Sequence, residues 1–457
     1  SSSTSEKGKS LYDELVAILG QDKVLAEPQE LVAYQVDAKL PSLVVFPSDN
    51  DHICQVVKIA NRHRIPLIPW GNGSKQAIGP PLTKTGIVLS LKNMSHLLEV
   101  DAPNLTAKVE AGMNHAELQR ELARHGLCFP LEPMDIESAT IGGSLATNSS
   151  GPARLVYGTA RDLILGITVV TPSGEVVHLG GKTMKNVAGY DLRKLFLGSW
   201  GTLGIITEAI LRLFYLPEEH KTMLLKFQNI ESLSQLVRQI SNSFLRPESM
   251  ELIDAIAAQS LGSEANFKLQ EGELLLLIGV GGSREIVERH ITETRELGTA
   301  NNAEIVTVLS GAEEKEIWTS QWHIQRSLSS LNPEMVRGKA VVPRHRIEDM
   351  YQEIQQATIK HGLQVGITGH AASGVLYPTF FSKSRDTQDN KILAVAADLI
   401  QSADTLGGFF LIESGPPEVR QAYDPVSQRS DYELMKRLKR ALDPQSILNP
   451  GKIIRNL

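Results

Sequence analysis

The sequence predicts an α+β protein whose two main parts differ in the order of their strands and helices. In residues 41–216, short apolar runs typical of buried strands alternate with amphipathic helices, and two glycine-rich loops follow predicted strands. In residues 217–430 the order is strand–helix–strand–strand–helix–strand, which is that of a ferredoxin-like unit, and it occurs twice. The residues themselves do not repeat, so a duplication rests on this pattern alone.

The N-terminal part, residues 1–40, is predicted to be helical because residues 11–19 have apolar side chains at helical spacing and end at Gly20. Residues 41–216, which we call the glycine-loop part, begin with a strand. Residues 48–51 (SDND) can cap the amphipathic helix that follows. Its predicted helices are 53–63 and 116–124, and its predicted strands are 43–47, 66–69, 87–91, 97–100, 107–110, 164–170, 174–178 and 203–213.

The ferredoxin-like part contains two sets of predicted elements. The first set has strands 223–227, 250–253, 274–280 and 304–309, with helices 231–244 and 283–296. A helix over 312–331 joins it to the second set, which has strands 340–342, 363–368, 375–380 and 407–412, with helices 346–360 and 386–403. The last part, residues 431–457, has a helix over 432–442 and a turn over 448–453, which we expect to return to the glycine-loop part.

The composition excludes several classes of protein. The formal net charge is −6 and no basic run occurs, so we expect no nucleic-acid partner. Two cysteines, Cys54 and Cys128, supply neither a disulfide framework nor a cysteine-rich metal or iron–sulfur site, and they favour a cytoplasmic location. No apolar run approaches the roughly 18–20 residues of a spanning helix, so we expect peripheral membrane association only through a partner. The polar first ten residues read as an expression remnant or a floppy terminus rather than a signal peptide.

Two glycine-rich loops predict a site for a large phosphate-containing ligand. The first is residues 70–79 (WGNGSKQAIG), and the second is residues 138–148 (SATIGGSLATN) with Gly151 and Gly158 beyond it. Glycine lets backbone N–H groups approach an anion closely. A lone loop of this kind is more often a structural turn, and the first loop matches neither the GxGxxG nor the Walker pattern. The second loop adds hydroxyl groups and an amide, so the pair favours a dinucleotide.

Further motifs resemble those of a known family. Residues 45–48 (VFPS) precede a predicted helix, and residues 133–143 (PMDIESATIGG) lead into the second glycine loop. The segments 185–192 (KNVAGYDL), 198–208 (GSWGTLGIITE) and 448–452 (LNPGK) follow in order. With the loop 70–79, these motifs span nearly the whole chain. It resembles the FAD-binding oxidoreductases of the vanillyl-alcohol oxidase type, in their glycolate oxidase/D-lactate dehydrogenase branch.

The resemblance implies a two-subdomain FAD-binding domain and a ferredoxin-like cap domain that closes over the flavin and binds substrate. The first loop would hold the pyrophosphate, and the second would lie along the ribityl chain and the isoalloxazine ring. No histidine stands in the usual context for a covalent flavin, so noncovalent FAD is expected. The residues expected to bind FAD are Pro69, Trp70, Gly71, Asn72, Gly73, Ser74, Lys75, Ala77, Pro133, Ser138, Thr140, Ile141, Gly142, Gly143, Ala146, Asn148, Gly151, Tyr157, Gly201, Gly204, Ile206 and Asn449.

The reaction that the resemblance implies is the oxidation of a small 2-hydroxy acid, with hydride transfer from the α-carbon to flavin N5. This chemistry needs a cation for the substrate carboxylate and a base for the hydroxyl proton. Arg326 suits the carboxylate role, because relatives place an arginine in a similar setting after tryptophans such as Trp318 and Trp322. A surface arginine is an equally supported interpretation, and Arg344 and Lys339 are weaker alternatives.

The catalytic end departs from the family pattern. Many relatives carry His-x-Gly-Asp-Gly-Asn-x-His and Glu-His-Gly segments, which supply divalent-metal ligands and a catalytic histidine. Here residues 370–377 read HAASGVLY and residues 413–415 read ESG, so His370 and Glu413 remain while Tyr377 and Ser414 stand at histidine positions. Two ligands do not make a zinc site, so we expect no metal. His370 is interpreted as a general base or carboxylate partner, or equally as a buried structural histidine.

Three functions therefore remain open. The first is an active FAD-dependent dehydrogenase of the glycolate or D-lactate class that passes electrons to an iron–sulfur partner or to quinone. Its candidate catalytic residues are His370, Arg326 and Tyr377. The second is an FAD-carrying but catalytically impaired subunit of a multi-subunit glycolate oxidase, in which a sister FAD subunit performs the reaction. The third is an FAD oxidase for a different alcohol.

Overall fold

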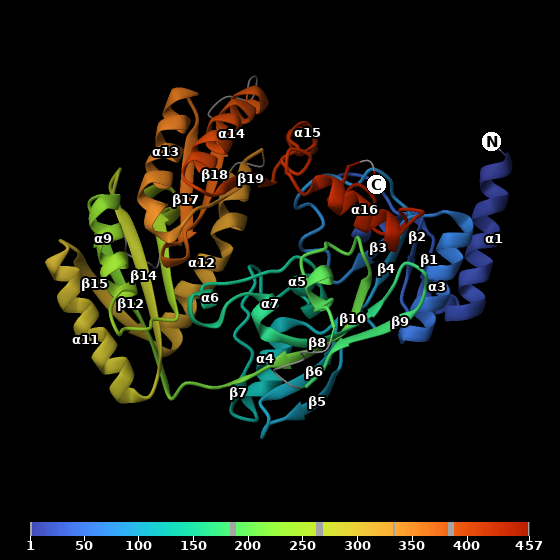
Figure 1. Ribbon diagram of the computed structural model, residues 1–457, viewed down its shortest axis with the longest axis horizontal. Helices are drawn as coiled ribbons and strands as arrows, with labels where there is room; N and C mark the ends of the chain where they lie inside the picture. Colours follow the sequence, from blue (N-terminus) through green and yellow to red (C-terminus); the bar gives the residue numbers. More distant parts are fainter. Residues whose placement is uncertain (1, 183–188, 262–267, 332–333, 383–387, 456) are drawn as a thin grey trace. The chain divides into compact units, whose positions relative to one another are not determined.

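The computed structural model describes residues 2–182, 189–261, 268–331, 334–382, 388–455 and 457 (Figure 1). The chain forms two compact units. Unit 1 comprises Ser1–Gly151, Gly158–Leu216 and Asp424–Leu457, and unit 2 comprises Pro152–Tyr157 and Pro217–Tyr423. Both units mix helices and strands, which confirms the predicted α+β class. In the described parts of the chain, no helix is long and apolar enough to cross a membrane.

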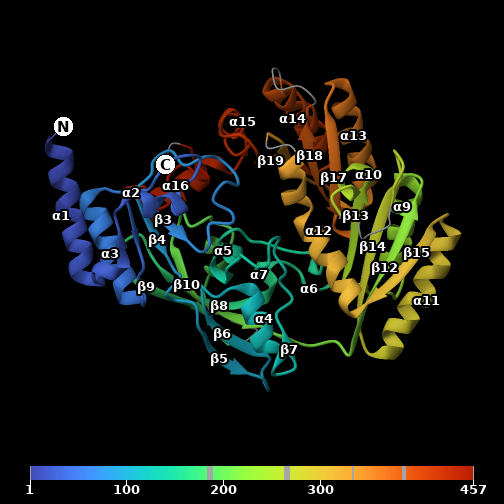
Figure 2. The same ribbon diagram turned by 180° about the vertical axis from the view of Figure 1, so that it is seen from behind.

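The first sheet of unit 1 has four short strands. Their order is β1 (Val24–Leu25), β2 (Leu43–Val45), β4 (Ile87–Ser90) and β3 (Leu67–Trp70), and β4 is parallel to both β2 and β3. Helix α2 (Pro28–Leu31) follows β1, and α3 (Asn50–His63) connects β2 to β3 beside α1 (Ser2–Leu19) (Figures 1 and 2). The side chain of Asp49 caps α3 by accepting a hydrogen bond from the backbone N–H of His52 at 2.8 Å. This strand–helix–strand unit positions the loop after β3.

The second sheet of unit 1 is antiparallel. Its order is β5 (Leu97–Asp101), β6 (Thr106–Glu110), β10 (Ile205–Arg212), β8 (Ile164–Val170) and β9 (Val176–Gly180). Helix α4 (His115–Ala123) follows β6, and α5 (Ile141–Ala146) packs against β10. The remaining strands and α-helices of the unit are the pair β7 (Leu127–Cys128) and β11 (Phe214–Tyr215), and the helices α7 (Ala160–Leu163), α8 (Arg193–Phe196) and α16 (Tyr432–Leu442).

Unit 2 contains one antiparallel sheet made of two ferredoxin-like halves, as the strand and helix order predicts. The first half has β12 (Glu219–Phe227), β13 (Ser249–Asp254), β14 (Leu274–Gly282) and β15 (Glu304–Ser310). The second has β16 (Val336–Val341), β17 (Gln364–His370), β18 (Val375–Phe381) and β19 (Phe409–Ser414). The spatial order β15-β12-β14-β13-β17-β18-β16-β19 joins the halves through their second strands, where Glu251 pairs with His370.

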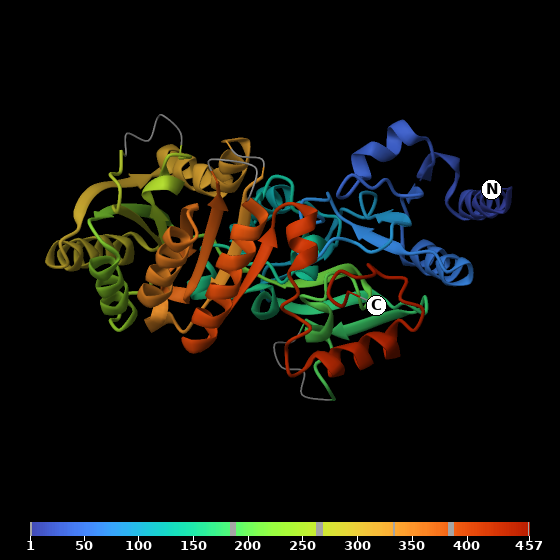
Figure 3. The same cartoon turned by 90° about the horizontal axis from the view of Figure 1, so that it is seen from above.

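The two faces of this sheet differ in chemistry. Helices α9 (Ile230–Ser241), α11 (Arg284–Ala300), α13 (Ile347–Lys360) and α14 (Gln388–Thr405) cover one face through a single apolar core, and Figure 3 shows α13 beside α14. On the other face, α12 (Gly311–Leu331) and α10 (Ala255–Ala258) pack against apolar residues of the first half. The second half of that face carries polar side chains instead. The short helices α6 (Arg154–Tyr157) and α15 (Pro417–Ala422) complete unit 2.

A histidine between two glutamates ties α12 to the first half of the sheet. His220 Nδ1 lies 2.5 Å from Glu314 Oε1, and its Nε2 lies 3.0 Å from Glu248 Oε2. Burial by itself lowers the pKa of His220, but the hydrogen bonds and charges of the two glutamates outweigh it and raise the pKa to about 10. The protonated imidazole therefore stabilises the folded unit most below pH 6.5, and this contribution is lost as the pH rises towards 10.

We expect His220→Gln to lower the thermal unfolding midpoint more at pH 6 than at pH 9.5. Between these pH values the imidazole of the unfolded wild-type chain loses its proton while the folded chain must still bind it, so the charged imidazole stabilises the folded state less and less. Thermal unfolding of both chains at pH 6, 8 and 9.5, followed by far-ultraviolet circular dichroism, measures the difference. A difference that stays constant over these three pH values would contradict the raised pKa. Lysine and tyrosine side chains titrate in both chains, so their effect cancels.

Candidate functional site

Unit 1 contains a pocket that is formed mainly by four separate stretches of the chain. The loop after β3 lies on one side, the N-terminal half of α5 lies on another, and the turn before β10 closes the pocket with two residues near the C-terminus. The residues that line it are Pro69, Trp70, Gly71, Asn72, Gly73, Ser74, Lys75, Gln76, Leu91, Ala111, Thr140, Gly142, Gly143, Ala146, Thr147, Trp200, Gly201, Gly204, Ile205, Ile206, Asn449 and Lys452.

Close backbone approach explains the glycines at two points of this pocket. A Cβ on Gly142 would lie 2.8 Å from the Cβ of Ala111, so only glycine lets α5 begin against that residue. The side chain of Thr140 caps α5 by accepting a hydrogen bond from the N–H of Gly143 at 3.2 Å. Gly201 has φ +67° and lies against Asn449, where any side chain would be strained.

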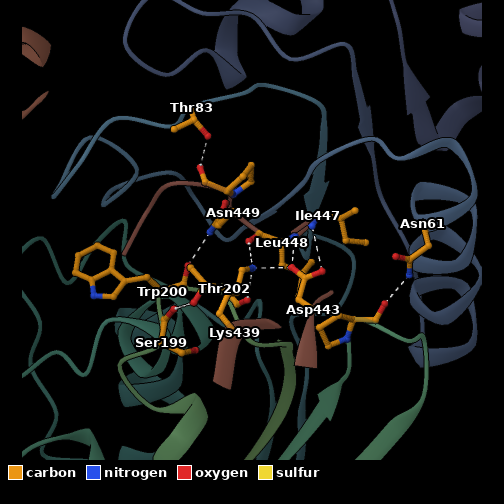
Figure 4. Close-up of polar contacts among 12 residues, drawn as sticks. Asn61, Thr83, Ser199, Trp200, Thr202, Lys439, Asp443, Ile447, Leu448 and Asn449 are labelled. Atoms are coloured by element: carbon orange, nitrogen blue, oxygen red, sulfur yellow. Dashed lines mark hydrogen bonds and ion pairs between the residues drawn. The ribbon is translucent and has the colours of Figure 1, made fainter. Parts of the chain in front are cut away.

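The C-terminal segment forms part of the pocket wall, and Figure 4 shows the polar contacts of its residue Asn449. Asn449 donates from Nδ2 to the carbonyl oxygen of Trp200 at 2.7 Å, and its backbone N–H donates to Leu67 of β3 at 3.0 Å. Lys452 Nζ donates to the carbonyl oxygen of Gln76 at 2.6 Å, so the same segment also holds the loop after β3. The pocket therefore depends on residues almost 400 positions apart in the sequence.

The chemistry of the pocket suits a polar anion. Its lining includes two lysines, Lys75 and Lys452, and no aspartate or glutamate. Asn449 Oδ1 is buried and has no hydrogen-bond partner among the described residues, so it is an acceptor that a ligand can satisfy. His115 lies beneath α5 with Nε2 at 2.9 Å from Ser144 Oγ, and burial together with the charge of Lys75 lowers its pKa to about 3. His115 is therefore neutral and leaves the charge of the pocket to the lysines.

Most residues predicted to bind FAD meet in this pocket, but seven lie elsewhere. Ile141 is fully buried, Tyr157 belongs to unit 2 and donates to Glu248 there, and Asn148 accepts a hydrogen bond from the N–H of Arg161. The others are Ala77, Pro133, Ser138 and Gly151.

Sequence reasoning did not single out Gln76, Leu91, Ala111, Thr147, Trp200, Ile205 and Lys452, although most adjoin predicted residues and Lys452 ends the motif that contains Asn449. Of the motif 185–192, residues 185–188 lie outside the described residues.

Unit 2 carries a cluster of charged side chains on the polar half of its sheet. Arg337 and Lys339 stand two residues apart on β16 and therefore share a face. Arg337 Nη1 lies 3.4 Å from Glu413 Oε2, and Lys339 Nζ lies 4.0 Å from Glu413 Oε1. The guanidinium of Arg337 also lies 4.3 Å from the ring centre of Tyr377. A register shift between β16 and β19 at Arg337 and Gly338 places Glu413 opposite this cluster.

A glutamate–histidine pair adjoins these residues. His370 Nδ1 lies 2.7 Å from Glu251 Oε1, where β13 and β17 join the two halves of the sheet. Both residues are buried, and Gln321 of α12 donates to the other carboxylate oxygen of Glu251 at 3.3 Å. The imidazole meets the ring of Tyr377 edge-on at 5.5 Å. The arrangement leaves Nε2 of His370 as the nitrogen that can exchange a proton, because the carboxylate fixes Nδ1.

Burial changes the proton affinities in this cluster. Burial lowers the pKa of the Lys339 ammonium, and Glu413 opposes this effect while Arg154 of α6 and Arg337 add to it. Burial and then Glu413 raise the pKa of Tyr377, so its phenol stays protonated. The cluster thus has three cations, Arg154, Arg337 and Lys339, and two carboxylates, those of Glu413 and Glu251. Arginine and lysine side chains of this kind suit an anionic ligand.

The predicted catalytic residues are only partly brought together. His370 and Tyr377 lie in the cluster. Arg326 belongs to α12, but its side chain is not among those that the structure describes. Arg344 is exposed just after β16. Arg337 and Glu251 were not predicted, although the spacing Arg-Gly-Lys on a strand was a signal for Arg337. Within the described ranges, no group of three or more histidine, cysteine, aspartate or glutamate side chains could hold a metal ion.

The fold and the pocket define a flavin-dependent oxidoreductase, and comparison with known proteins agrees. Residues 41–180 match the model of an FAD binding domain, and residues 216–453 match that of the C-terminal domain of FAD linked oxidases. The chain belongs to the FAD-linked oxidase family, and its cofactor is FAD.

Individual proteins show the same likeness. The chain is 33% identical to the glycolate oxidase subunit GlcD of Bacillus subtilis over 97% of both chains. It is 30% identical to a D-lactate dehydrogenase of Archaeoglobus fulgidus, over 91% of this chain and 92% of that protein. A solved alkyldihydroxyacetonephosphate synthase has the same fold, with a TM-score of 0.74 and 21% identity over 97% of this chain and 86% of the other.

Proposed function

We propose that this chain is an FAD-dependent dehydrogenase of small 2-hydroxy acids of the glycolate or D-lactate class. The observation that carries the proposal is the polar cluster of unit 2, in which two cations and a glutamate–histidine pair surround Tyr377. A 2-hydroxy acid needs a partner for its carboxylate and a base for its hydroxyl proton, and these groups can supply both. The named activities of the relatives support the same class of substrate.

In this proposal Arg337 binds the substrate carboxylate and Lys339 assists it. A guanidinium can hold a carboxylate through two parallel hydrogen bonds, which fixes the orientation of the α-carbon. His370 then accepts the hydroxyl proton at Nε2, while Glu251 holds the proton at Nδ1 and stabilises the imidazolium. FAD, when bound, supplies the two-electron acceptor for this oxidation. Tyr377 stays protonated and provides an aromatic surface between the base and the cations.

The residues of unit 1 that line its pocket are proposed to hold FAD noncovalently. The lining includes no histidine, cysteine or tyrosine, so none of these described residues offers a side chain for a covalent flavin bond. Lys75 and Lys452 would balance the charge of the pyrophosphate, and backbone N–H groups of the glycine loop would donate to its oxygens.

We expect Lys75→Met to weaken FAD binding by roughly 10- to 100-fold, because a hydrogen bond to a charged group contributes about 1.5–3 kcal/mol. Titration of the deflavinated chain with FAD, followed by quenching of flavin fluorescence, measures the affinity at low and high salt. The matched control is Lys108→Met, which removes a lysine paired with Glu208 at 2.8 Å in unit 1 and outside the pocket. Equal FAD affinity of the Lys75→Met and wild-type chains would contradict the pyrophosphate role.

A second candidate is the FAD-carrying subunit of a complex in which a sister subunit performs the reaction. The presence of Tyr377 and Ser414 at expected histidine positions favours it, as does the likeness to a protein named as a glycolate oxidase subunit. Electrons would then leave through an iron–sulfur partner or to quinone. This candidate and the active dehydrogenase share the FAD site but differ in whether the isolated chain is reduced by substrate.

Anaerobic addition of glycolate, D-lactate, L-lactate and D-2-hydroxyglutarate to the purified, FAD-loaded chain separates these candidates. We expect one acid to bleach the flavin absorbance near neutral pH. If none of the four reduces the flavin of the isolated chain, the dehydrogenase proposal fails and the subunit candidate remains. Reduction that appears only after a sister subunit is added would support that candidate directly.

A further inference from the structure

A buried lysine of α16 and the buried aspartate that follows this helix bind the turns that line the flavin pocket (Figure 4). Lys439 is 3% exposed and Asp443 is 1% exposed. Lys439 Nζ donates to Asp443 Oδ2 at 2.6 Å, to the carbonyl oxygen of Thr202 at 2.8 Å and to that of Leu448 at 2.9 Å. A lysine ammonium has three N–H donors, so every donor of this side chain is used.

The two carbonyl acceptors belong to turns with unusual backbone conformations. Thr202 follows Trp200 and Gly201, which have φ +56° and +67°, and Leu448 precedes Asn449, which has φ +40°. Left-handed backbone at residues other than glycine is strained and persists only where the surroundings hold it. Trp200, Gly201 and Asn449 all line the pocket, so the strain lies where the cofactor is expected.

Further hydrogen bonds connect the same turns into a closed network. Asp443 accepts from the N–H groups of Ile447 at 3.1 Å and Leu448 at 2.9 Å. Asn449 donates from Nδ2 to the carbonyl oxygen of Trp200 at 2.7 Å, which completes a path from Lys439 through both turns and back. Because Nδ2 is used in this way, Oδ1 of Asn449 is the atom left for a ligand, and it has no partner among the described residues.

We propose that Lys439 and Asp443 are positioning residues of the flavin pocket. The pair fixes the separation between the Trp200–Gly201 turn and Asn449, and it thereby orients the free amide oxygen of Asn449 and the backbone of the turn. The proposal rests on FAD binding by this pocket. A buried ion pair is weak support for stability, since apolar residues of similar size often replace one without loss of stability. If Lys439 and Asp443 instead position the pocket, replacing the pair by apolar residues should weaken cofactor binding even where stability is unchanged.

The test compares Lys439→Met, Asp443→Asn and the double variant Lys439→Met/Asp443→Leu in the full-length chain. The double variant removes both charges at once, so it avoids leaving a single charge buried. We expect all variants that fold to bind FAD at least roughly tenfold more weakly than the wild-type chain, since each loses hydrogen bonds that hold the two turns in their FAD-binding arrangement. We also expect a shifted flavin absorption band and midpoint potential in the double variant, even where its thermal midpoint matches the wild type.

Leu118→Ala is the control, because Leu118 is fully buried in unit 1 and does not line the pocket. It lowers stability through a cavity and should leave the flavin spectrum and potential unchanged. Wild-type FAD affinity, spectrum and potential in the double variant would overturn the proposal, as would equal changes in the Leu118→Ala control. If no Lys439 variant folds, Asp443→Asn with a wild-type spectrum overturns it. None of these measurements uses a substrate, so they fail or succeed independently of the proposed 2-hydroxy acid oxidation.

Discussion

Replacing Arg337 by methionine should leave FAD bound but lower kcat/KM for the 2-hydroxy acid by roughly 30-fold to several thousand-fold. Arg337 is 6% exposed, and truncating one member of a buried, hydrogen-bonded charge pair costs about 2–5 kcal/mol. Arg337→Lys should have a smaller but distinct effect, because lysine keeps the charge and loses the planar fork that holds a carboxylate at two points. Stopped-flow measurement of anaerobic flavin reduction over a range of acid concentrations gives these values.

Two controls separate substrate binding from a structural role of Arg337. Arg344→Met changes an exposed arginine close in sequence and should have wild-type kinetics. Arg337→Met/Glu413→Gln removes the ion partner as well, so it relieves any cost of leaving Glu413 without its arginine partner. If Arg337 only neutralises Glu413, this double variant should regain activity. If Arg337 binds the substrate, the double variant should stay as slow as the single one.

The sequence predicted the regular elements of both units well because their side-chain periodicity is strong. β8 (Ile164–Val170) is a fully buried run that is apolar except for Thr168, and α3 (Asn50–His63) has a capping residue and an amphipathic pattern. The ferredoxin-like order of unit 2 follows in the same way from alternating runs. The elements missed, such as β1, β7 and α6, span only two to four residues, which is too short for any periodicity.

The two parts of the candidate site differed in how far the sequence predicted them. The flavin pocket is built from contiguous loops, so motifs such as residues 70–79 and Asn449 predicted most of its lining. The cluster of unit 2 instead brings single residues from β13, β16, β17, β18 and β19 to one face of a sheet. Which residues meet there depends on strand order and on the register shift beside Glu413. A single sequence contains neither, and for that reason Arg337 and Glu251 were missed.

Replacing His370 by glutamine should slow flavin reduction by roughly 10²- to 10⁴-fold, which is the usual range for loss of a general base. Glu251→Gln should slow it as well, because an amide can hold the imidazole in place but cannot stabilise its positive charge. The double variant should be about as slow as His370→Gln alone, since both residues act as one unit. FAD affinity, measured in the same samples, should not change.

Lys339 is the competing base, because burial lowers the pKa of its ammonium and it lies 5.8 Å from the ring centre of Tyr377. If Lys339 were the base, Lys339→Met would abolish reduction while His370→Gln retained most of it. If His370 is the base, Lys339→Met should mainly raise KM, since the loss of one cation weakens carboxylate binding without removing the proton acceptor. Whether each of these two variants changes kcat or KM therefore decides which nitrogen takes the hydroxyl proton. A wild-type kcat in His370→Gln would refute the role proposed for the glutamate–histidine pair.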